Sequence, residues 1–279
     1  MTDLHDHDRG LAFDLPNLLN RRRMLTLMAG AGLALVGCGS NGDKNASATT
    51  TSAVSSGASG ASTTAVPAAD GTCETMPSET EGPYPGNGSN GPDILSQSGV
   101  VRSDIRSSIG SANGVAEGVP LTINLTVLDN GKNCEAYKGA AVYLWQCDRD
   151  ARYSMYSRGA ENENYLRGVQ VADADGRVTF KSIFPAAYQG RYPHIHFQVF
   201  PTLAAATSGS GEVITSQLAL PEDTCKLVYA TAGYESSPQN LARTSLTSDM
   251  VFRDSYQQQL ATMSGSVSGG FTAELTVGV

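Results

Sequence analysis

The chain has 279 residues, of which 40% are hydrophobic and 16% are charged, and its 19 basic and 27 acidic residues give a net charge of −8. A chain of this length and apolar content can bury one substantial core or at most two small ones, so it is not wholly disordered. The acidic balance and the lack of a clustered basic face argue against a nucleic-acid partner, because binding to phosphate backbones needs dense Lys and Arg.

The first 37 residues have the pattern of an export signal. Arginines at positions 21–23 precede an apolar run, Met24 to Gly37, of about 14 residues, whereas a membrane-spanning helix needs about 20. Small residues then lead into Cys38. The pattern resembles a bacterial twin-arginine signal that ends in a lipobox, in which Cys38 becomes the lipidated first residue of the mature protein. The alternative is a buried N-terminal helix with an incidental cysteine.

Residues 38–70 form a Ser/Ala/Thr-rich segment without aromatic residues, and Val54 and Val66 are its only larger aliphatic side chains. Such a composition cannot offset the entropy cost of ordering, so we expect a flexible tether. Removal of residues 1–37 leaves 15 basic and 23 acidic residues, so the mature chain is still acidic. The sequence thus predicts a cell-surface or periplasmic lipoprotein that meets the membrane only through its lipid anchor.

The mature domain has four cysteines besides the lipidated one. An even number in an exported chain predicts two disulfides, with buried free thiols as the alternative. Four cysteines allow three pairings, and the sequence does not choose among them. The absence of a Cys-x-x-Cys motif argues against a zinc ribbon or a thioredoxin-type site. These cysteines are Cys73, Cys134, Cys147 and Cys225.

From residue 121 onward, short runs with alternating or β-branched residues are separated by turn signals such as Asp129-Asn130-Gly131. Regularly spaced strands of this kind predict an all-β fold, a single β-sandwich domain over residues 71–279 with mostly antiparallel strands and long loops. Residues 238–261 are the least clear segment and are expected to be partly helical. The expected strands are 121–128, 140–145, 177–183, 194–200, 212–220 and 271–279.

The chain has four histidines, and two of them lie in the predicted signal, which leaves His194 and His196. Two histidines cannot form a three-histidine zinc site or the cupin arrangement. Side chains at i and i+2 of a strand point to the same face, so the two imidazoles would lie side by side while Ile195 points into a core. This is a geometry for metal ligands, although a solvated strand face would have the same spacing.

The surroundings of these histidines carry a more specific signal. Five ordered stretches resemble the intradiol ring-cleavage dioxygenases, the family of catechol and protocatechuate 3,4-dioxygenases. They are residues 80–84, 145–154, 167–180, 183–197 and 214–218.

The resemblance implies an oxidoreductase that cleaves a catechol-type diol with O2 to a cis,cis-muconate-type dicarboxylate. It implies one Fe(III) per site, held by Tyr153 and Tyr188 as tyrosinates and by His194 and His196. A phenolate is a hard anionic donor that suits Fe(III), and metal binding drives its deprotonation.

The resemblance also implies supporting roles. Tyr188 would act in catalysis as the ligand that the substrate displaces, Arg191 would stabilise negative charge on the bound diol, and Gln217 falls on the family's glutamine beside the metal. Gly82, Pro83 and Tyr84 would wall the substrate pocket. One departure concerns Ala151-Arg152 before Tyr153, where relatives often have a glycine, so the backbone of this loop is expected to differ.

Two rival hypotheses remain at this stage. One is a lipid-anchored extracytoplasmic β-sandwich that binds a ligand or a protein without catalysis, and the other is a copper oxidase, which would ordinarily need a third nitrogen donor. The sequence leaves open which substituted catechol is cleaved and whether the chain forms a homo-oligomer.

Overall fold

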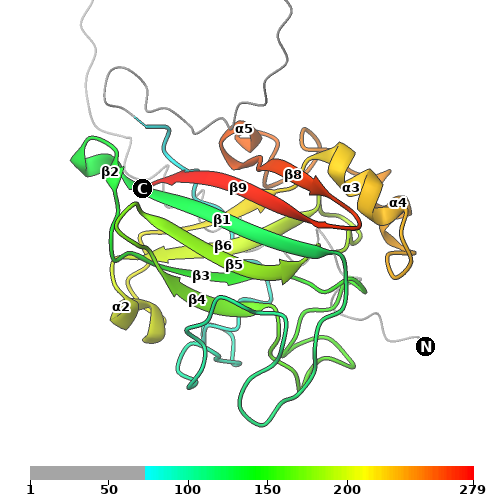
Figure 1. Cartoon of the computed structure of the whole chain (residues 1–279), viewed down its shortest axis with the longest axis horizontal. Coiled ribbons are helices and arrows are strands. Elements are labelled where there is room, and N and C mark those ends of the chain that lie inside the picture. Colours follow the sequence, from blue (N-terminus) through cyan, green and yellow to red (C-terminus); the bar gives the residue numbers. More distant parts are fainter. Residues whose placement is uncertain (1–72) are drawn as a thin grey trace, which may run out of the picture.

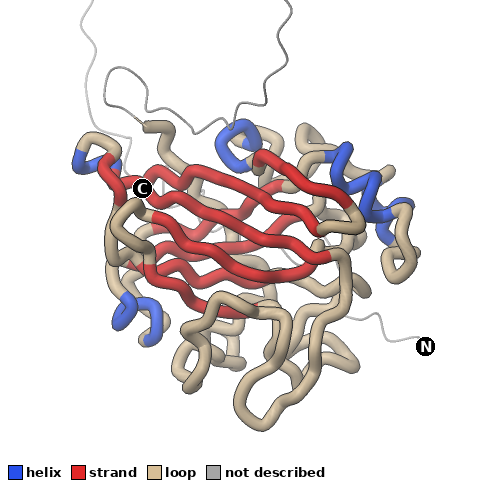
Figure 2. Tube along the Cα trace, viewed as in Figure 1, coloured by secondary structure: helices blue, strands red, loops and turns tan. Residues whose placement is uncertain are grey.

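The computed structural model describes residues 73–279 (Figure 1). The predicted export signal, the predicted lipidation site Cys38 and the predicted tether lie outside the described residues. Strands make up most of the regular structure in the described part, and the helices there are short (Figure 2).

The first sheet is built around the long strand β1. The polar and apolar residues of β1 alternate, and the structure buries the apolar set on one face. Strands β2 and β5 pair with β1 antiparallel, whereas β9 pairs with it parallel and continues to β8. The strands of this sheet are β1 (Pro120–Asp129), β2 (Glu135–Ala136), β5 (Arg177–Ile183), β8 (Thr262–Ser266) and β9 (Gly270–Gly278).

The second sheet has the order β4-β3-β6-β7, and each neighbouring pair is antiparallel. All seven residues of β6 are buried, which means that both faces of this strand are covered. The strands of this sheet are β3 (Ala141–Trp145), β4 (Arg167–Val171), β6 (His194–Phe200) and β7 (Ile214–Ala219).

The main hydrophobic core lies between the two stacked sheets (Figure 1). Ile123 and Leu125 of β1 meet Leu144 of β3 and Ile195 and Phe197 of β6 in this core. A second cluster forms on the opposite face of the second sheet, where loop residues such as Tyr84 and Tyr153 cover Tyr143 and Trp145 of β3. The outer face of the second sheet is therefore a buried surface, and it is there that the candidate site lies.

Short helices fill the connections. They are the 3-10 turn η2 (Asn130–Lys132) and the α-helices α2 (Leu203–Thr207), α3 (Glu222–Tyr229), α4 (Ser237–Leu241) and α5 (Tyr256–Gln259). The segment 238–261 is only partly helical, as expected, because turns separate α4 from α5. Among residues 73–279, no helix has both the length and the apolar character that crossing a bilayer requires.

The predicted β-sandwich is confirmed, and each of the six expected strands is present with its ends shifted by a few residues at most. Strands β2, β4 and β8 and helices α2 and α3 were not predicted. Strand β4 begins with a buried arginine and a glycine, and β8 is an exposed polar edge strand, so neither has the apolar alternation that identifies a strand in sequence.

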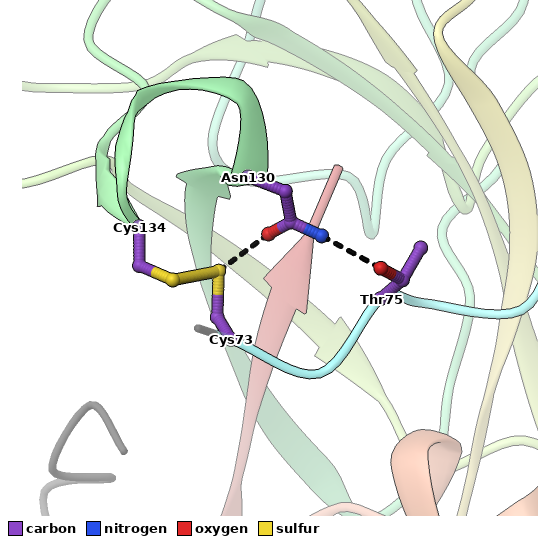
Figure 3. The surroundings of a disulfide bond; sticks show 4 residues. All are labelled: Cys73, Thr75, Asn130 and Cys134. Atoms are coloured by element: carbon purple, nitrogen blue, oxygen red, sulfur yellow. Dashed lines mark hydrogen bonds between the residues drawn. A yellow bond between two sulfur atoms is a disulfide. The ribbon is translucent and has the colours of Figure 1, made fainter. Parts of the chain in front are cut away.

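The expectation of two disulfides is wrong for one pair. Cys73 is bonded to Cys134, whereas Cys147 and Cys225 are buried free thiols whose sulfur atoms contact backbone carbonyls. The disulfide joins the first described residues to the turn after β1, and Asn130 lies beside it (Figure 3). The amide nitrogen of Asn130 donates to Thr75 Oγ1 at 2.9 Å. The bridge thus fastens the start of the domain to its central strand.

Candidate active site

The two histidines begin strand β6 and point to the outer face of the second sheet. Each is only 2% exposed, while Ile195 between them is buried in the core on the other side. The strand register places Trp145 of β3 and Gln217 of β7 directly opposite His196. The predicted arrangement of the pair on one face is confirmed, and this face is buried rather than solvated.

Four candidate metal ligands come together on this face. Tyr153 lies in the loop between β3 and β4, and Tyr188 lies in the loop between β5 and β6. The Oη atoms of the two tyrosines are 3.4 Å apart, and Tyr188 Oη is 3.1 Å from His194 Nε2. His194 Nε2 is in turn 3.1 Å from His196 Nε2. Two phenol oxygens and two imidazole nitrogens from three separate segments are therefore neighbours.

Burial shifts these groups towards their neutral forms. Burial lowers the pKa of His194 to about 3, and the positive charge of Arg191 acts in the same direction. Burial also lowers the pKa of His196 well below its usual value, and the nearby His194 acts in the same direction. Burial and then Tyr188 raise the pKa of Tyr153 well above its usual value. Neutral imidazoles have a lone pair to offer, and a phenolate here needs a cation for compensation, so the donor set fits a hard metal ion such as Fe(III).

The orientation of His194 is fixed by its backbone. Its Nδ1 lies 2.5 Å from the carbonyl oxygen of Tyr192, an acceptor, so we infer that Nδ1 carries the proton. The lone pair is then on Nε2, which faces Tyr188 and His196. This is the tautomer that a metal ligand of this orientation requires.

His196 is held by packing. The Trp145 indole stacks on its imidazole with ring centroids 4.9 Å apart and an angle of 7° between the planes. Gly82 lies on the same imidazole, because a Cβ built at Gly82 would be 3.2 Å from His196 Cε1, and its φ is +72°. Two residues that are distant in sequence thus confine the ring, and a side chain at Gly82 would press on it.

The loop that contains Gly82 forms a wall beside the tyrosine ligands. The Tyr84 ring lies 4.9 Å from the Tyr153 ring, as measured between centroids. Pro83 adjoins both residues along the chain, and its carbonyl accepts a hydrogen bond from Asn90. The structure therefore places the predicted pocket residues next to the candidate ligands.

Arg191 and Gln217 are in direct contact. Arg191 Nη2 donates to Gln217 Oε1 at 2.7 Å, and Gln217 Nε2 donates to the carbonyl of Thr80 at 2.9 Å. Both side chains are buried, which excludes a surface role for either. Arg191 also forms a buried ion pair with Asp249, a residue that the sequence analysis did not identify.

Arg167 is a second residue whose role the sequence did not indicate. Its guanidinium is fully buried and donates to the carbonyls of Tyr84, Pro85 and Ser154. It therefore ties the pocket wall to the residue that follows Tyr153. Nothing in the local pattern around Arg167 could reveal this, because its acceptors are backbone atoms of distant segments.

Ala151 has an unusual backbone conformation in the loop before Tyr153. Its φ is +65°, in the left-handed region that glycine adopts most easily, and Ala151 N donates to the carbonyl of Asp148. An alanine thus takes a conformation here that is more typical of glycine.

No group of three or more His, Cys, Asp or Glu side chains could hold a metal ion within residues 73–279. A metal at this place must therefore use the tyrosines.

The family model described as Dioxygenase matches residues 90–249, which is more than half of the chain. An intradiol ring-cleavage dioxygenase from Tetranychus urticae has a similar structure, with a TM-score of 0.57 and 25% sequence identity over 74% of this chain and 94% of that one. The chain belongs to the intradiol ring-cleavage dioxygenase family. A second solved dioxygenase structure has a TM-score of 0.56 at 25% identity, again over 74% of this chain and 94% of that one. No curated protein sequence matches the chain significantly.

Membership in the intradiol dioxygenases makes the chain an oxidoreductase enzyme that acts on catechol-type diols. The hypothesis of a binding module without catalysis has no support from the comparisons.

Proposed function

We propose that this dioxygenase uses one non-haem Fe(III) to cleave a catechol-type diol with O2 to a cis,cis-muconate-type dicarboxylate. The iron would be held by Tyr153, Tyr188, His194 and His196. The observation that carries the proposal is the row of four donor atoms, 3.1 to 3.4 Å apart, on a buried face of the second sheet. Bound there, the ferric ion would supply the Lewis acidity and one-electron chemistry that let a catecholate react with O2.

The two tyrosines differ in a way that suggests different tasks. Tyr153 is 1% exposed and packs against Tyr84, whereas Tyr188 is only partly buried. We assign Tyr153 to permanent binding of the metal. We assign Tyr188 to proton transfer, in which its Oη accepts a proton from one hydroxyl of the incoming diol.

Arg191 would interact with the bound diol in the same site. Its guanidinium is buried and fixed, so it can stabilise negative charge on the diol more strongly than an exposed arginine could. Gly82, Pro83 and Tyr84 would exclude water from the space above the ligands, which strengthens every electrostatic interaction within it.

The test uses the 279-residue chain loaded with iron. Its visible spectrum is recorded before and after anaerobic addition of catechol, and oxygen is then admitted. A tyrosinate-to-iron band that shifts with catechol and decays as muconate absorbance rises is the expected result. A colourless protein that shows no change at any step would contradict the proposal.

Two single variants separate the roles of the tyrosines. Tyr153→Phe should bleach most of the visible band and weaken iron retention, because it removes a buried ligand. Tyr188→Phe should retain iron better and lose more of the reaction with catechol. Tyr137→Phe, whose ring lies near Lys132 at the first sheet, is the matched control and should behave as the wild type. Full activity in both site variants would refute the ligand assignment.

We also propose that the chain is exported by the twin-arginine route, lipidated at Cys38, and tethered through residues 38–70 at the cell surface or in the periplasm. The disulfide between Cys73 and Cys134 supports this proposal, because such bonds persist in oxidising compartments. A route that exports folded proteins would also allow the metal to bind before the chain crosses the membrane.

A further inference from the structure

Asp249 lies far from the metal-ligand motif in sequence, in the turns between α4 and α5, but its side chain contacts Arg191. Its side chain is completely inaccessible to solvent, and that of Arg191 is 3% exposed. Asp249 Oδ2 accepts from Arg191 Nε at 3.1 Å, and Oδ1 accepts from Arg191 Nη2 at 3.5 Å. The carboxylate therefore accepts hydrogen bonds from the Nε–Nη2 edge of the guanidinium.

The carboxylate is itself fixed by backbone donors. Tyr192 N donates to Oδ2 at 2.7 Å, and the N–H groups of Val251 and Phe252 donate to Oδ1 at 2.8 and 3.3 Å. Burial alone would raise the pKa of Asp249, but Arg191 and the Tyr192 N–H outweigh it and hold the pKa below its usual value. Asp249 is thus an ionised group at a defined position.

Arg191 is held on its other side by Gln217, which accepts from Nη2 at 2.7 Å. An arginine side chain has many rotamers, and a buried guanidinium without a carboxylate is strongly destabilised, so such a group would tend to turn towards water. Two acceptors on different atoms fix both the position and the plane of the guanidinium. Gln217 is neutral, so of these two acceptors only Asp249 has a charge opposite to that of Arg191.

The same carboxylate is linked to a candidate metal ligand. The N–H of Tyr192 donates to Asp249, and the carbonyl of Tyr192 is the partner of His194 Nδ1. The turn that begins at Asp249 also brings Phe252 against His194, with ring centroids 6.4 Å apart. The segment after α4 thus packs against residues 191–194 and forms hydrogen bonds with them.

We propose that Asp249 is a positioning residue that holds Arg191 at the angle needed to stabilise charge on the bound diol. This inference rests on the proposed function, because it concerns the same site. It adds a residue from a segment outside the metal-ligand motif.

The first experiment is a double-mutant cycle in the iron-loaded enzyme with Asp249→Asn, Arg191→Gln and the double variant. Asparagine keeps an acceptor for Tyr192 N but removes the charge that pairs with Arg191. We expect Asp249→Asn to lower kcat by about 10- to 100-fold with a smaller change in KM, since a misplaced group costs mainly transition-state stabilisation. In the Arg191→Gln background the same change should lower kcat by less than about twofold. Equal losses in both backgrounds would overturn the proposal.

The second experiment does not need activity. In the metal-free protein, NMR measures the exchange of the Arg191 Nε–H with water, which the Asp249 carboxylate should slow. We expect exchange to be at least about tenfold faster in Asp249→Asn. An unchanged rate would overturn the positioning role, and this result holds even if the enzyme does not cleave catechol.

Asp173→Asn is the matched control, because Asp173 also accepts two backbone N–H groups in a turn but is exposed. It should change neither kcat nor the Arg191 exchange rate. If Asp249→Asn does not fold, Asp249→Glu carries the same test, since it keeps the charge and moves the carboxylate by one methylene. Slower turnover together with faster exchange would support the proposal, and wild-type values of both would overturn it.

Discussion

Gly82 shows how a single residue without a side chain shapes the site. Its backbone has a φ of +72°, and a Cβ at this position would lie 3.2 Å from Cε1 of the His196 ring, so the ring would have to give way by a few tenths of an ångström. Both features favour glycine at this position, since a left-handed conformation costs other residues about 1–2 kcal/mol and stacking on Trp145 restricts how far the imidazole can move.

Gly82→Ala should therefore displace His196 and lower activity by about tenfold or more, because sub-ångström errors in ligand position are costly. The measurement is kcat together with the tyrosinate-to-iron band. Gly139→Ala is the control, because Gly139 has a φ of +84° but a Cβ added to it would meet no atom within 4 Å. If both variants lose activity equally, backbone strain rather than the contact with His196 is the cause.

Glu79, which lies near the site, should make the free energy of unfolding depend on pH. Burial, followed by the charge of Asp254, raises its pKa from 4.5 to about 7, while Ser255 and Arg191 act in the opposite direction and Asp249 adds to the rise. Because the pKa of this carboxyl group is higher in the folded state than in the unfolded state, its protonated form stabilises the folded protein. This stabilisation is fully present below the unfolded-state pKa and is lost as the pH rises through the folded-state pKa. The carboxyl group thus disfavours the folded state above about pH 7.

Glu79→Gln should remove this effect, because glutamine can accept the Ser255 hydrogen bond and does not ionise. Thermal unfolding of the metal-free protein should show nearly equal midpoints for variant and wild type at pH 4 and a higher midpoint for the variant at pH 8. The exposed Glu74→Gln is the control. A variant that is less stable than the wild type at pH 8 would refute the argument.

At the scale of elements, strand β6 divides the tasks between its two faces. Ile195 and Phe197 enter the core between the sheets, while His194 and His196 enter the buried outer face. The alternation of a β-strand thus joins the stability of the fold to the position of the candidate ligands. This relation could be predicted from sequence, because it depends only on residues that are neighbours along the chain.

The loop contributions could not be predicted in the same way. Asp249 is 58 residues from Arg191, and Gly82 is more than 100 residues from His196, so no local pattern relates them. The resemblance to the dioxygenases identified Gly82 and included Trp145 and Arg167 in its stretches, but the roles of these two residues and of Asp249 became visible only through their contacts. The even number of cysteines also misled, because Cys147 and Cys225 are buried as free thiols.

The disulfide between Cys73 and Cys134 is the element that ties the N-terminal segment to β1. The sequence separation of 61 residues predicts a stabilisation of about 4 kcal/mol from the reduced entropy of the unfolded chain. The double variant Cys73→Ala/Cys134→Ala should lose about this amount in urea unfolding. Reductant should destabilise the wild type similarly and leave the variant unchanged; an effect of reductant on the variant would assign the loss to another cause.

The β-sandwich as a whole separates its main hydrophobic core from the candidate active site. The core between the sheets contains mostly aliphatic and aromatic side chains, whereas the buried polar groups of the site gather on the outer face of one sheet. Loops from distant parts of the sequence cover that face. The site can therefore contain buried polar groups without weakening the packing between the sheets.

The proposed export and lipidation of the chain can be tested separately. Cys38→Ser should move the protein from the membrane fraction to the soluble exported fraction, because the lipid is its expected anchor. Replacement of Arg22 and Arg23 by lysine should instead retain the chain in the cytoplasm. Membrane association of the Cys38→Ser variant equal to that of the wild type would refute lipidation at this residue.

The all-β class, six of the strands, the shared face of the two histidines and the family could all be read from the amino-acid sequence. These properties follow from local periodicity and from an ordered motif, and both depend only on the order of residues along the chain. The folded structure was needed to show which cysteines pair, that the histidine face is buried, and that Asp249 and Arg167 support the site. Those facts depend on contacts between distant segments, and such contacts are set by packing rather than by any neighbouring residue.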